Sequence, residues 1–225
     1  MTTDSALFPR QEQLRDGAVL ATIAYAIWLA HDPTLVNELS WDGPNYSRQD
    51  TAGTRGTVTF GDGVLVGVFR DEHSPRSPLG TDQPYNLNLY LRGMPPELRD
   101  MADEEALQYV LEDHQGVTGP IITAAFWSDD ATLTAAEPWP DVMKHGAHLV
   151  RRELLNSDTA LEAWREDLDL TGDEMNLARS LFRRKMEEHK EKITLTEHER
   201  RILLAQGDEG ADVARSLLNA VGLAF

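Results

Sequence analysis

The longest apolar run of the chain lies near its N-terminus, over residues 17–30 (GAVLATIAYAIWLA). It is shorter than the roughly 20 residues that span a bilayer. The residues before it carry three acidic side chains against two arginines, whereas a secretory leader begins with a net positive segment. The pattern therefore predicts a buried core helix in a cytoplasmic protein that does not enter a membrane.

Two β-rich runs predict a hairpin at about residues 57–69. The runs TVTF and VLVGVF are joined by Gly61-Asp62-Gly63, and glycine supplies the positive φ that such turns need. The second run is apolar on both faces. A strand of that kind is expected inside a sheet rather than at its edge.

Two further segments predict strands, at about residues 85–91 and 121–127. The first alternates, with tyrosine and leucine on one side and Asn86, Asn88 and Tyr90 on the other. The second is continuously apolar. Between them, a proline pair predicts the start of a helix over about residues 95–114, because prolines in a first turn lose no hydrogen bond.

The pattern from residue 138 onward is helical. Residues 139–155 place apolar side chains at helical spacing, and a short helix is expected over 211–221. Three Thr-x-x-Glu sequences fit the capping box that begins a helix; they start at Thr159, Thr171 and Thr196.

These elements predict an α+β fold. An antiparallel or mixed sheet packs with the N-terminal core helix, and the C-terminal half of the chain is helical. The chain divides into an acidic α+β part over residues 1–136 and an all-helical part over residues 137–225. No Pro- or Ser-rich linker separates the two parts, so a single compact domain fits the pattern equally well.

The chain is strongly acidic. Its 225 residues include 21 Lys and Arg and 38 Asp and Glu, a net charge of −17. Residues 1–136 hold 8 basic and 20 acidic side chains, a net charge of −12. A negative field repels phosphate, which argues against general nucleic-acid binding. The absence of cysteine excludes disulfides, thiolate metal sites and a cysteine nucleophile.

Established catalytic and cofactor motifs are absent from the sequence. Gly61, Gly63 and Gly67 sit between two predicted strands, whereas a dinucleotide loop joins a strand to a helix. There is no phosphate loop, nucleophile elbow or HExxH metal motif. We therefore expect no cofactor, and the pattern does not decide whether the protein is an enzyme.

Arginines gather around the predicted hairpin, at Arg48, Arg55, Arg70, Arg76 and Arg92. Guanidinium groups bind carboxylate or phosphate through paired hydrogen bonds, so several at one strand end predict an anion site. His73, beside Asp71 and Glu72, is the natural proton-transfer group for such a site. The alternative is that these arginines pair internally with Asp50, Asp71 and Glu72 and orient a loop.

Two asparagines, Asn86 and Asn88, lie on the polar side of the strand predicted at 85–91. Their amides are candidate ligand contacts. A solvent-exposed face of an antiparallel sheet explains these asparagines equally well.

A metal site is a further candidate. Asp141, His145 and His148, with Arg152 beyond them, follow offsets of 4, 3 and 4 residues, which places all four on one stripe of the helix predicted at 139–155. Two imidazoles and a carboxylate suit a first-row metal ion. An exposed polar helix face is the simpler interpretation of the same spacing.

Two functions of different classes fit these observations. The first is an acidic binding or inhibitory protein, immunity-like in charge and size, that docks a basic protein partner, because a negative field speeds association with a cationic surface. The second is a small-molecule enzyme or ligand-binding protein that holds an anionic substrate with the Arg/Asp/His cluster near the hairpin. The pattern carries no prediction of oligomeric state.

Overall fold

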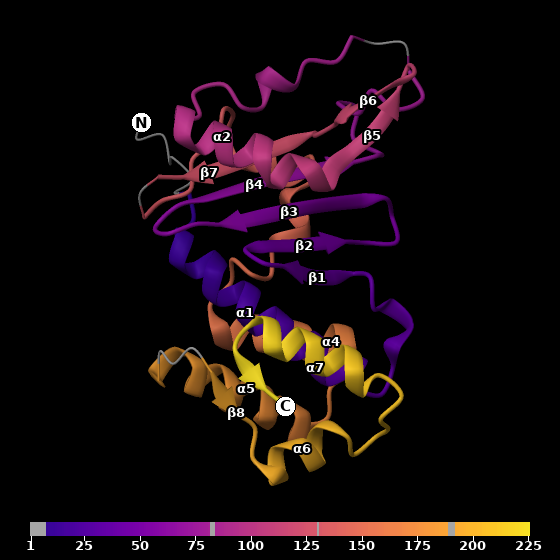
Figure 1. The fold of residues 1–225 in the computed structure, drawn as a ribbon, viewed down its shortest axis with the longest axis vertical. Coiled ribbons are helices and arrows are strands. Elements are labelled where there is room, and N and C mark those ends of the chain that lie inside the picture. The colour runs from indigo at the N-terminus through magenta and orange to yellow at the C-terminus, as the bar shows by residue number, and fades with distance from the viewer. Residues whose placement is uncertain (1–7, 82–83, 130, 189–191) are drawn as a thin grey trace, which may run out of the picture. The chain divides into compact units, whose positions relative to one another are not determined.

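The computed structural model describes residues 8–81, 84–129, 131–188 and 192–225 (Figure 1). Contacts divide the chain into two compact units, each built from two separate stretches. The first unit contains residues 1–12 and 44–151, and the second contains residues 13–43 and 152–225. The domain boundary predicted at residue 136 stays a prediction.

The sheet is antiparallel, as predicted, and has the strand order β1-β2-β3-β4-β7. Its strands are β1 (Leu39–Asp42), β2 (Asn45–Gln49), β3 (Thr54–Phe60), β4 (Leu65–Asp71) and β7 (Ala124–Ser128). The predicted hairpin is confirmed as β3 and β4, with Gly63 of the turn at φ +71°. Strand β4 lies between β3 and β7 and is buried up to its last residue, which confirms its predicted interior position.

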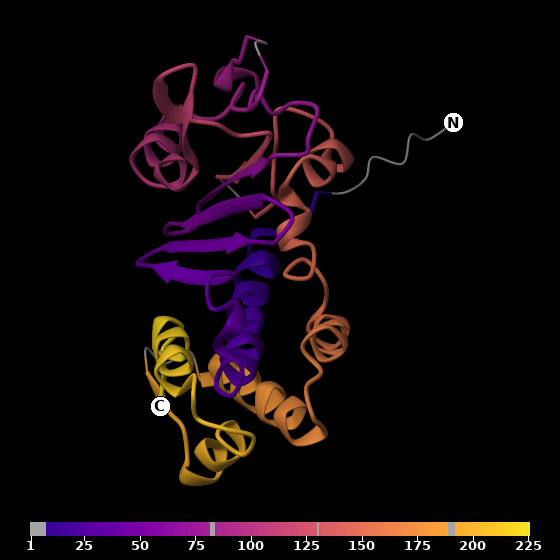
Figure 2. The same cartoon turned by 90° about the vertical axis from the view of Figure 1, so that its right-hand side faces the viewer.

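In the first unit, the pleat of β4 divides its side chains between two cores. Val66 and Val68 belong to an apolar cluster with Leu98 of α2 (Pro96–Glu104). On the other face, Phe69 packs on Phe126, which in turn packs against Trp139 of α3 (Trp139–Lys144). Figure 2 shows α2 and α3 on opposite sides of the sheet.

The prediction of a strand at 85–91 is wrong. This segment contains a single 3-10 turn, η2 (Leu87–Leu89), flanked by irregular chain. Asn86 accepts a hydrogen bond from the backbone N–H of Asn88 and so caps the turn. Such a local hydrogen bond gives the backbone an alternative to pairing with a neighbouring β-strand. Leu89, predicted to face the core, is 60% exposed.

The helix predicted over 95–114 is too long. Helix α2 ends at Glu104, and η3 (Ala106–Val110), a 3-10 helix, follows it. The chain then forms an unpredicted hairpin of β5 (Leu111–His114) and β6 (Val117–Pro120). Gln115 and Gly116 between the two strands have φ values of +54° and +76°, the geometry of a tight two-residue turn.

The helix predicted over 139–155 is interrupted. Helix α3 ends at Lys144, and η4 (Ala147–Val150) is a separate 3-10 turn. Gly146 between them has a φ of +141°, and a Cβ there would lie 2.8 Å from the Cβ of Phe69. The chain turns at this glycine because the close approach to β4 leaves no room for a helix side chain.

The second unit contains all but the first two residues of the predicted core helix, α1 (Gln11–Leu29), whose residues 20–27 are all buried. Among the described residues, no helix combines the length and the apolar character needed to cross a membrane. The remaining elements are η1 (Pro33–Leu35), α4 (Ser157–Leu168), α5 (Gly172–Glu188), α6 (Glu197–Leu203), α7 (Ala211–Ala220) and the parallel pair β8 (Ile193–Thr194) and β9 (Leu223–Ala224). These helices confirm the predicted helical C-terminal half.

Two of the three predicted capping boxes are confirmed. Thr171 and Glu174 exchange side-chain and backbone hydrogen bonds before α5, and Thr196 and Glu199 do the same before α6. The third prediction is wrong, because α4 begins at Ser157 and is capped by the side chain of Asn156.

Candidate ligand site

Two arginines face each other across neighbouring strands of the first unit. Arg55 of β3 and Arg70 of β4 are direct partners in the antiparallel register, so their side chains leave the same face of the sheet. Arg70 is only 4% exposed. Like charges at directly opposed positions repel each other, and burial strengthens the repulsion. The pair therefore requires a negative partner.

Glu112 of β5 supplies that partner. Arg55 Nη2 donates to Glu112 Oε2 at 2.6 Å, and Arg70 Nη1 donates to the same oxygen. Arg70 Nη2 also donates to Glu72 Oε1 at 2.9 Å. Glu112 is absent from the sequence-based candidates because the pattern predicts a helix there, and one glutamate in an acidic chain carries no signal of its own. We call Arg55, Arg70 and Glu112 the arginine–carboxylate cluster.

Burial works against the positive charges of this cluster. It lowers the pKa of the Arg70 guanidinium below its usual range, the charge of Arg55 lowers it further, and Glu72 opposes both effects. The Nε atoms of Arg55 and Arg70 are buried and have no hydrogen-bond partner in the described part of the chain. Two guanidiniums that share one carboxylate oxygen and retain unused donors are well suited to another oxyanion.

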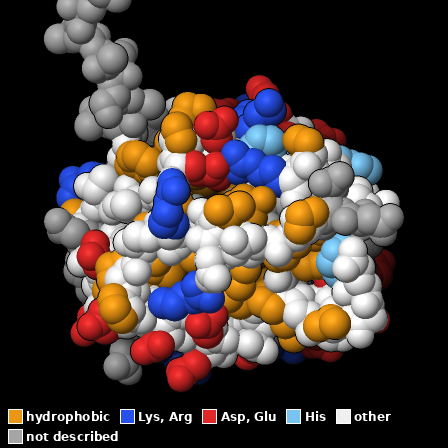
Figure 3. All heavy atoms as spheres, turned by 90° about the horizontal axis from the view of Figure 1, so that it is seen from above, with side chains coloured by type: hydrophobic (Ala, Val, Ile, Leu, Met, Phe, Trp, Pro, Cys, Tyr) orange, Lys and Arg blue, Asp and Glu red, His pale blue; other side chains and the backbone are white. Residues whose placement is uncertain are grey.

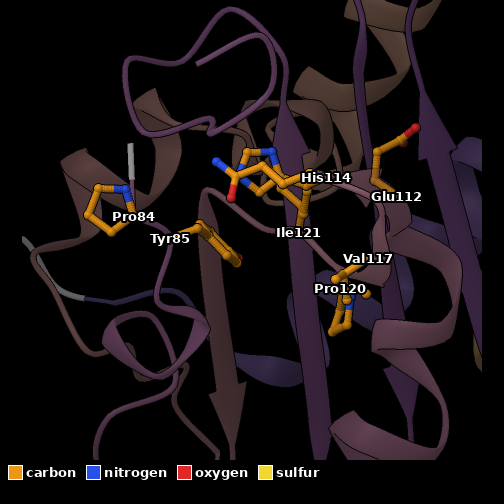
Figure 4. A pocket seen from close by; sticks show the side chains of 9 residues that line it. Pro84, Tyr85, Glu112, His114, Val117, Pro120 and Ile121 are labelled. Carbon is orange, nitrogen blue, oxygen red and sulfur yellow. The ribbon is translucent and has the colours of Figure 1, made fainter. Parts of the chain in front are cut away.

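A pocket of about 340 Å³ opens beside Glu112. Its walls come from the segment before η2, from the β5–β6 hairpin and from the residue that follows the hairpin. They are Pro84, Tyr85, Glu112, His114, Gln115, Val117, Gly119, Pro120 and Ile121. Figure 4 shows Tyr85 on one side of the opening and Ile121 and Val117 on the other, while the carboxylate of Glu112 points away from them.

The Tyr85 wall is fixed by two hydrogen bonds. The Tyr85 hydroxyl accepts from the backbone N–H of Ile122 at 2.7 Å and donates to the carbonyl of the same residue at 3.0 Å. Burial raises the pKa of Tyr85 well above its usual range. The hydroxyl is thus held neutral and occupied in both directions, so Tyr85 shapes the pocket and offers it an aromatic ring.

The structure brings together two of the five candidate arginines and separates the other three. Arg48 of β2 is the register partner of Gly56, so it projects from the sheet face opposite to Arg55. Arg76 donates to Glu137 Oε1 at 2.6 Å and to the carbonyl of Thr123 at 3.1 Å. Arg92 is exposed beyond η2. The pleat of the sheet, which sequence proximity does not convey, separates Arg48 from Arg55.

The candidate proton-transfer residues lie at the end of β4 and in the turn that follows it. The backbone N–H of exposed His73 donates to Asp71 Oδ1 at 2.9 Å. Glu72 pairs with Arg70, as the internal-pairing alternative expects. Asp50 instead accepts from the backbone N–H groups of Ala52 and Thr54 and orders the β2–β3 turn. A catalytic role for His73 stays a prediction.

The candidate amides lie outside the pocket wall. The side-chain oxygen of Asn86 caps η2, and Asn88 Oδ1 accepts from Arg99 Nη1 at 3.0 Å. Both amides therefore have local structural partners.

The predicted metal stripe is broken by the turn at Gly146. Asp141 lies in α3, His145 ends that helix, and His148 lies in η4. Arg152 pairs with Asp167 instead. In the described ranges no group of three or more His, Asp or Glu side chains is arranged to hold a metal ion.

His145 makes a buried hydrogen bond. Its Nδ1 lies 2.9 Å from Ser74 Oγ, and the residue is 7% exposed. Burial lowers the pKa of His145 below its ordinary value of 6.5, Arg76 and Lys144 lower it further, and Glu137 and Asp141 act in the opposite sense.

This histidine predicts a pH-dependent stability. As the pH falls below 6.5, the unfolded chain takes up a proton at His145 before the folded chain does. The free energy of unfolding is therefore lost progressively from pH 6.5 down to the folded pKa. In denaturant titrations across that range, His145→Asn should show a shallower decline than the parent protein. Equal slopes would contradict the prediction.

Together, the fold and the cluster define an α+β protein with an arginine–carboxylate cluster beside a partly apolar pocket. Comparisons with protein-family models, curated proteins and solved structures found no match to the chain. The functional argument therefore rests on the residues of the site itself.

Proposed function

We propose that the protein binds a small anionic molecule at the arginine–carboxylate cluster and the pocket beside it. The observation that carries the proposal is the convergence of Arg55 and Arg70 on one carboxylate oxygen of Glu112, a residue of the pocket wall. An oxyanion is the chemistry that two adjacent guanidiniums recognise best. The pocket also falls within the size range of small-molecule sites.

Binding is favoured over catalysis by the state of the pocket side chains. Glu112 accepts from two guanidiniums, and the Tyr85 hydroxyl is occupied as both donor and acceptor. These contacts hold groups in place rather than prepare them to exchange protons. The proposal is therefore for a binding site.

A thermal-shift experiment tests the proposal with phosphate and phenylpropanoate as probes. A ligand at about 100 times its dissociation constant stabilises the folded state by about 2.7 kcal/mol. We expect at least one probe to raise the melting temperature of the parent protein and to have no effect on Arg55→Ala. Arg55 is about one third exposed, so that variant should remain folded.

The matched control is Arg92→Ala, which removes an exposed arginine far from the cluster in sequence and should keep the full shift. No shift of the parent protein with either probe, or an equal shift in Arg55→Ala, would contradict anion binding at this site.

A second candidate function is docking of a basic protein partner, which the overall acidity favours. The supporting observation is the outer face of α2, where Glu97, Asp100 and Glu104 are all exposed. Against it, Figure 3 shows acidic side chains spread among hydrophobic and basic ones on the face seen from above, with no continuous acidic patch. For this reason the ligand site is our first proposal.

Affinity capture from the native host tests the docking proposal. We expect the parent protein to capture one basic protein in a one-to-one complex. The triple variant Glu97→Gln, Asp100→Asn, Glu104→Gln should not capture it. The control is Asp158→Asn, Glu162→Gln, Glu166→Gln, which removes the same charge from exposed positions of α4. Equal capture by both variants would contradict docking through α2.

A further inference from the structure

We infer that Glu112 is an internal competitor for the arginine pair, and that the ligand of this site is an organic carboxylate with an apolar body that displaces it. The inference rests on the anion-binding function proposed above. It adds the chemical class of the ligand and the way in which the site is kept closed.

The first observation is that Glu112 belongs both to the pocket wall and to the arginine–carboxylate cluster. It lines the pocket and also accepts from both Arg55 and Arg70. Its side chain is 32% exposed, so solvent already reaches the carboxylate. A displaced Glu112 would leave both guanidiniums without the carboxylate oxygen that they share.

The second observation is the space beside Glu112. Gly119 of β6 is its direct register partner, so a side chain at either position leaves the same face of the hairpin. A Cβ built at Gly119 would meet no atom within 4 Å in the part of the chain that the structure describes. This open position gives the Glu112 side chain room to turn without moving the hairpin.

The third observation is the independence of the element that carries Glu112. Strands β5 and β6 form their own two-stranded sheet, outside the five-stranded one. Leu111 and Val117 of this hairpin are 39% and 70% exposed. In the described chain this hairpin is a sheet of its own, so a side chain on it can turn without breaking a ladder of the five-stranded sheet.

The pocket walls select the remainder of the ligand. The ring of Tyr85 and the side chains of Pro84, Val117, Pro120 and Ile121 form the apolar part of the wall. A ligand carboxylate that replaces Glu112 becomes the new negative partner of the two arginines, so their positive charges stay neutralised. The apolar body then supplies the net gain through burial in the pocket.

The competition between Glu112 and a ligand carboxylate should have a measurable effect on ligand affinity. A group tethered next to its binding site acts at an effective concentration of about millimolar or more, so an incoming carboxylate must exceed that to displace it. Removal of the Glu112 carboxylate should therefore raise the affinity for a matching ligand.

The test is isothermal titration of the full chain with phenylpropanoate, in the parent protein, Glu112→Ala and Glu112→Gln. We expect both variants to bind phenylpropanoate at least about tenfold more tightly than the parent. Glu112→Gln keeps the size of the side chain and gives a reading if Glu112→Ala does not fold. Asp113→Ala is the matched control, since Asp113 is an exposed neighbour on the same strand, and it should bind as the parent does.

Two further probes test the charge and the apolar body of the ligand separately. Phenylpropanamide is neutral, and acetate has a carboxylate but no phenyl group. Both should bind at least about tenfold more weakly than phenylpropanoate, because one lacks the charge and the other the apolar contact. Acetate binding as tight as phenylpropanoate would overturn the apolar body. If the parent binds phenylpropanoate and neither Glu112 variant binds it more tightly, the internal competitor is wrong while the proposed function stands. If neither the parent nor the variants bind any anion, both are wrong.

Discussion

Substitution of Gly17 by alanine should destabilise the protein by about 3 kcal/mol or more, the upper end of the range for overpacked interiors. Gly17 lies in α1 of the second unit, where the backbone of Glu153 passes directly over it. An added Cβ would overlap the Glu153 carbonyl oxygen and lie 2.5 Å from its Cα. Alanine favours a helix over glycine by only about 1 kcal/mol, so the overlap dominates. Denaturant unfolding measures the change.

Gly172→Ala is the matched control for this prediction. Gly172 begins α5, and a Cβ there would meet no atom within 4 Å in the described chain. Its free energy of unfolding should stay equal to that of the parent protein or rise slightly, because the unfolded chain loses freedom. Similar values for the two variants would show that the crossing of Glu153 over α1 is not as close as described.

Substitution of Arg70 by alanine should lower the free energy of unfolding by about 2–3 kcal/mol, somewhat less than for a fully buried pair because Glu112 is partly exposed. The variant removes a buried guanidinium and leaves Glu112 and Glu72 without one of their cations. It should also abolish the thermal shift given by phosphate or phenylpropanoate. Arg92→Ala should change stability by no more than about 0.5 kcal/mol, as exposed substitutions do.

A double-variant cycle with Glu112→Ala checks the origin of that loss. If the arginine and the carboxylate stabilise the fold through each other, the loss in Arg70→Ala, Glu112→Ala should be smaller than the sum of the two single losses. Additive losses would mean that Arg70 acts through its packing alone.

The sequence predicts those elements whose cause is local. The β3–β4 hairpin follows from β-branched runs around a glycine turn, and α1 follows from one long apolar run. The capping boxes before α5 and α6 follow from side chains three residues apart. In each case the residues that determine the structure are neighbours in the chain.

The errors arise where a distant contact or a local polar bond competes with the pattern. Residues 85–91 alternate like a strand, but the Asn86 side chain binds its own backbone and forms a turn. Residues 139–155 repeat like a helix, but the approach of Phe69 to Gly146 interrupts it. No periodicity in the segment itself contains either competing contact.

The candidate site was predictable in part for the same reason. The turn between β3 and β4 makes Arg55 and Arg70 neighbours, and both are among the predicted arginines. Glu112 lies more than 40 residues further along the chain and reaches them only through the tertiary fold. The sequence therefore indicates the cations but not the carboxylate that balances them.

The two hydrogen bonds of Tyr85 also affect how this protein meets other chains. Strand β7 is the last strand of the five-stranded sheet, and an outer strand usually offers free backbone groups to any passing strand. Here Thr134 occupies the N–H and the carbonyl of Trp127, and the Tyr85 hydroxyl occupies both groups of Ile122 just before the strand. The Tyr85 side chain and the bridge between Trp127 and Thr134 thus bind backbone groups at this edge that a sixth strand would otherwise bind. The protein thereby protects this edge of the sheet against edge-to-edge aggregation.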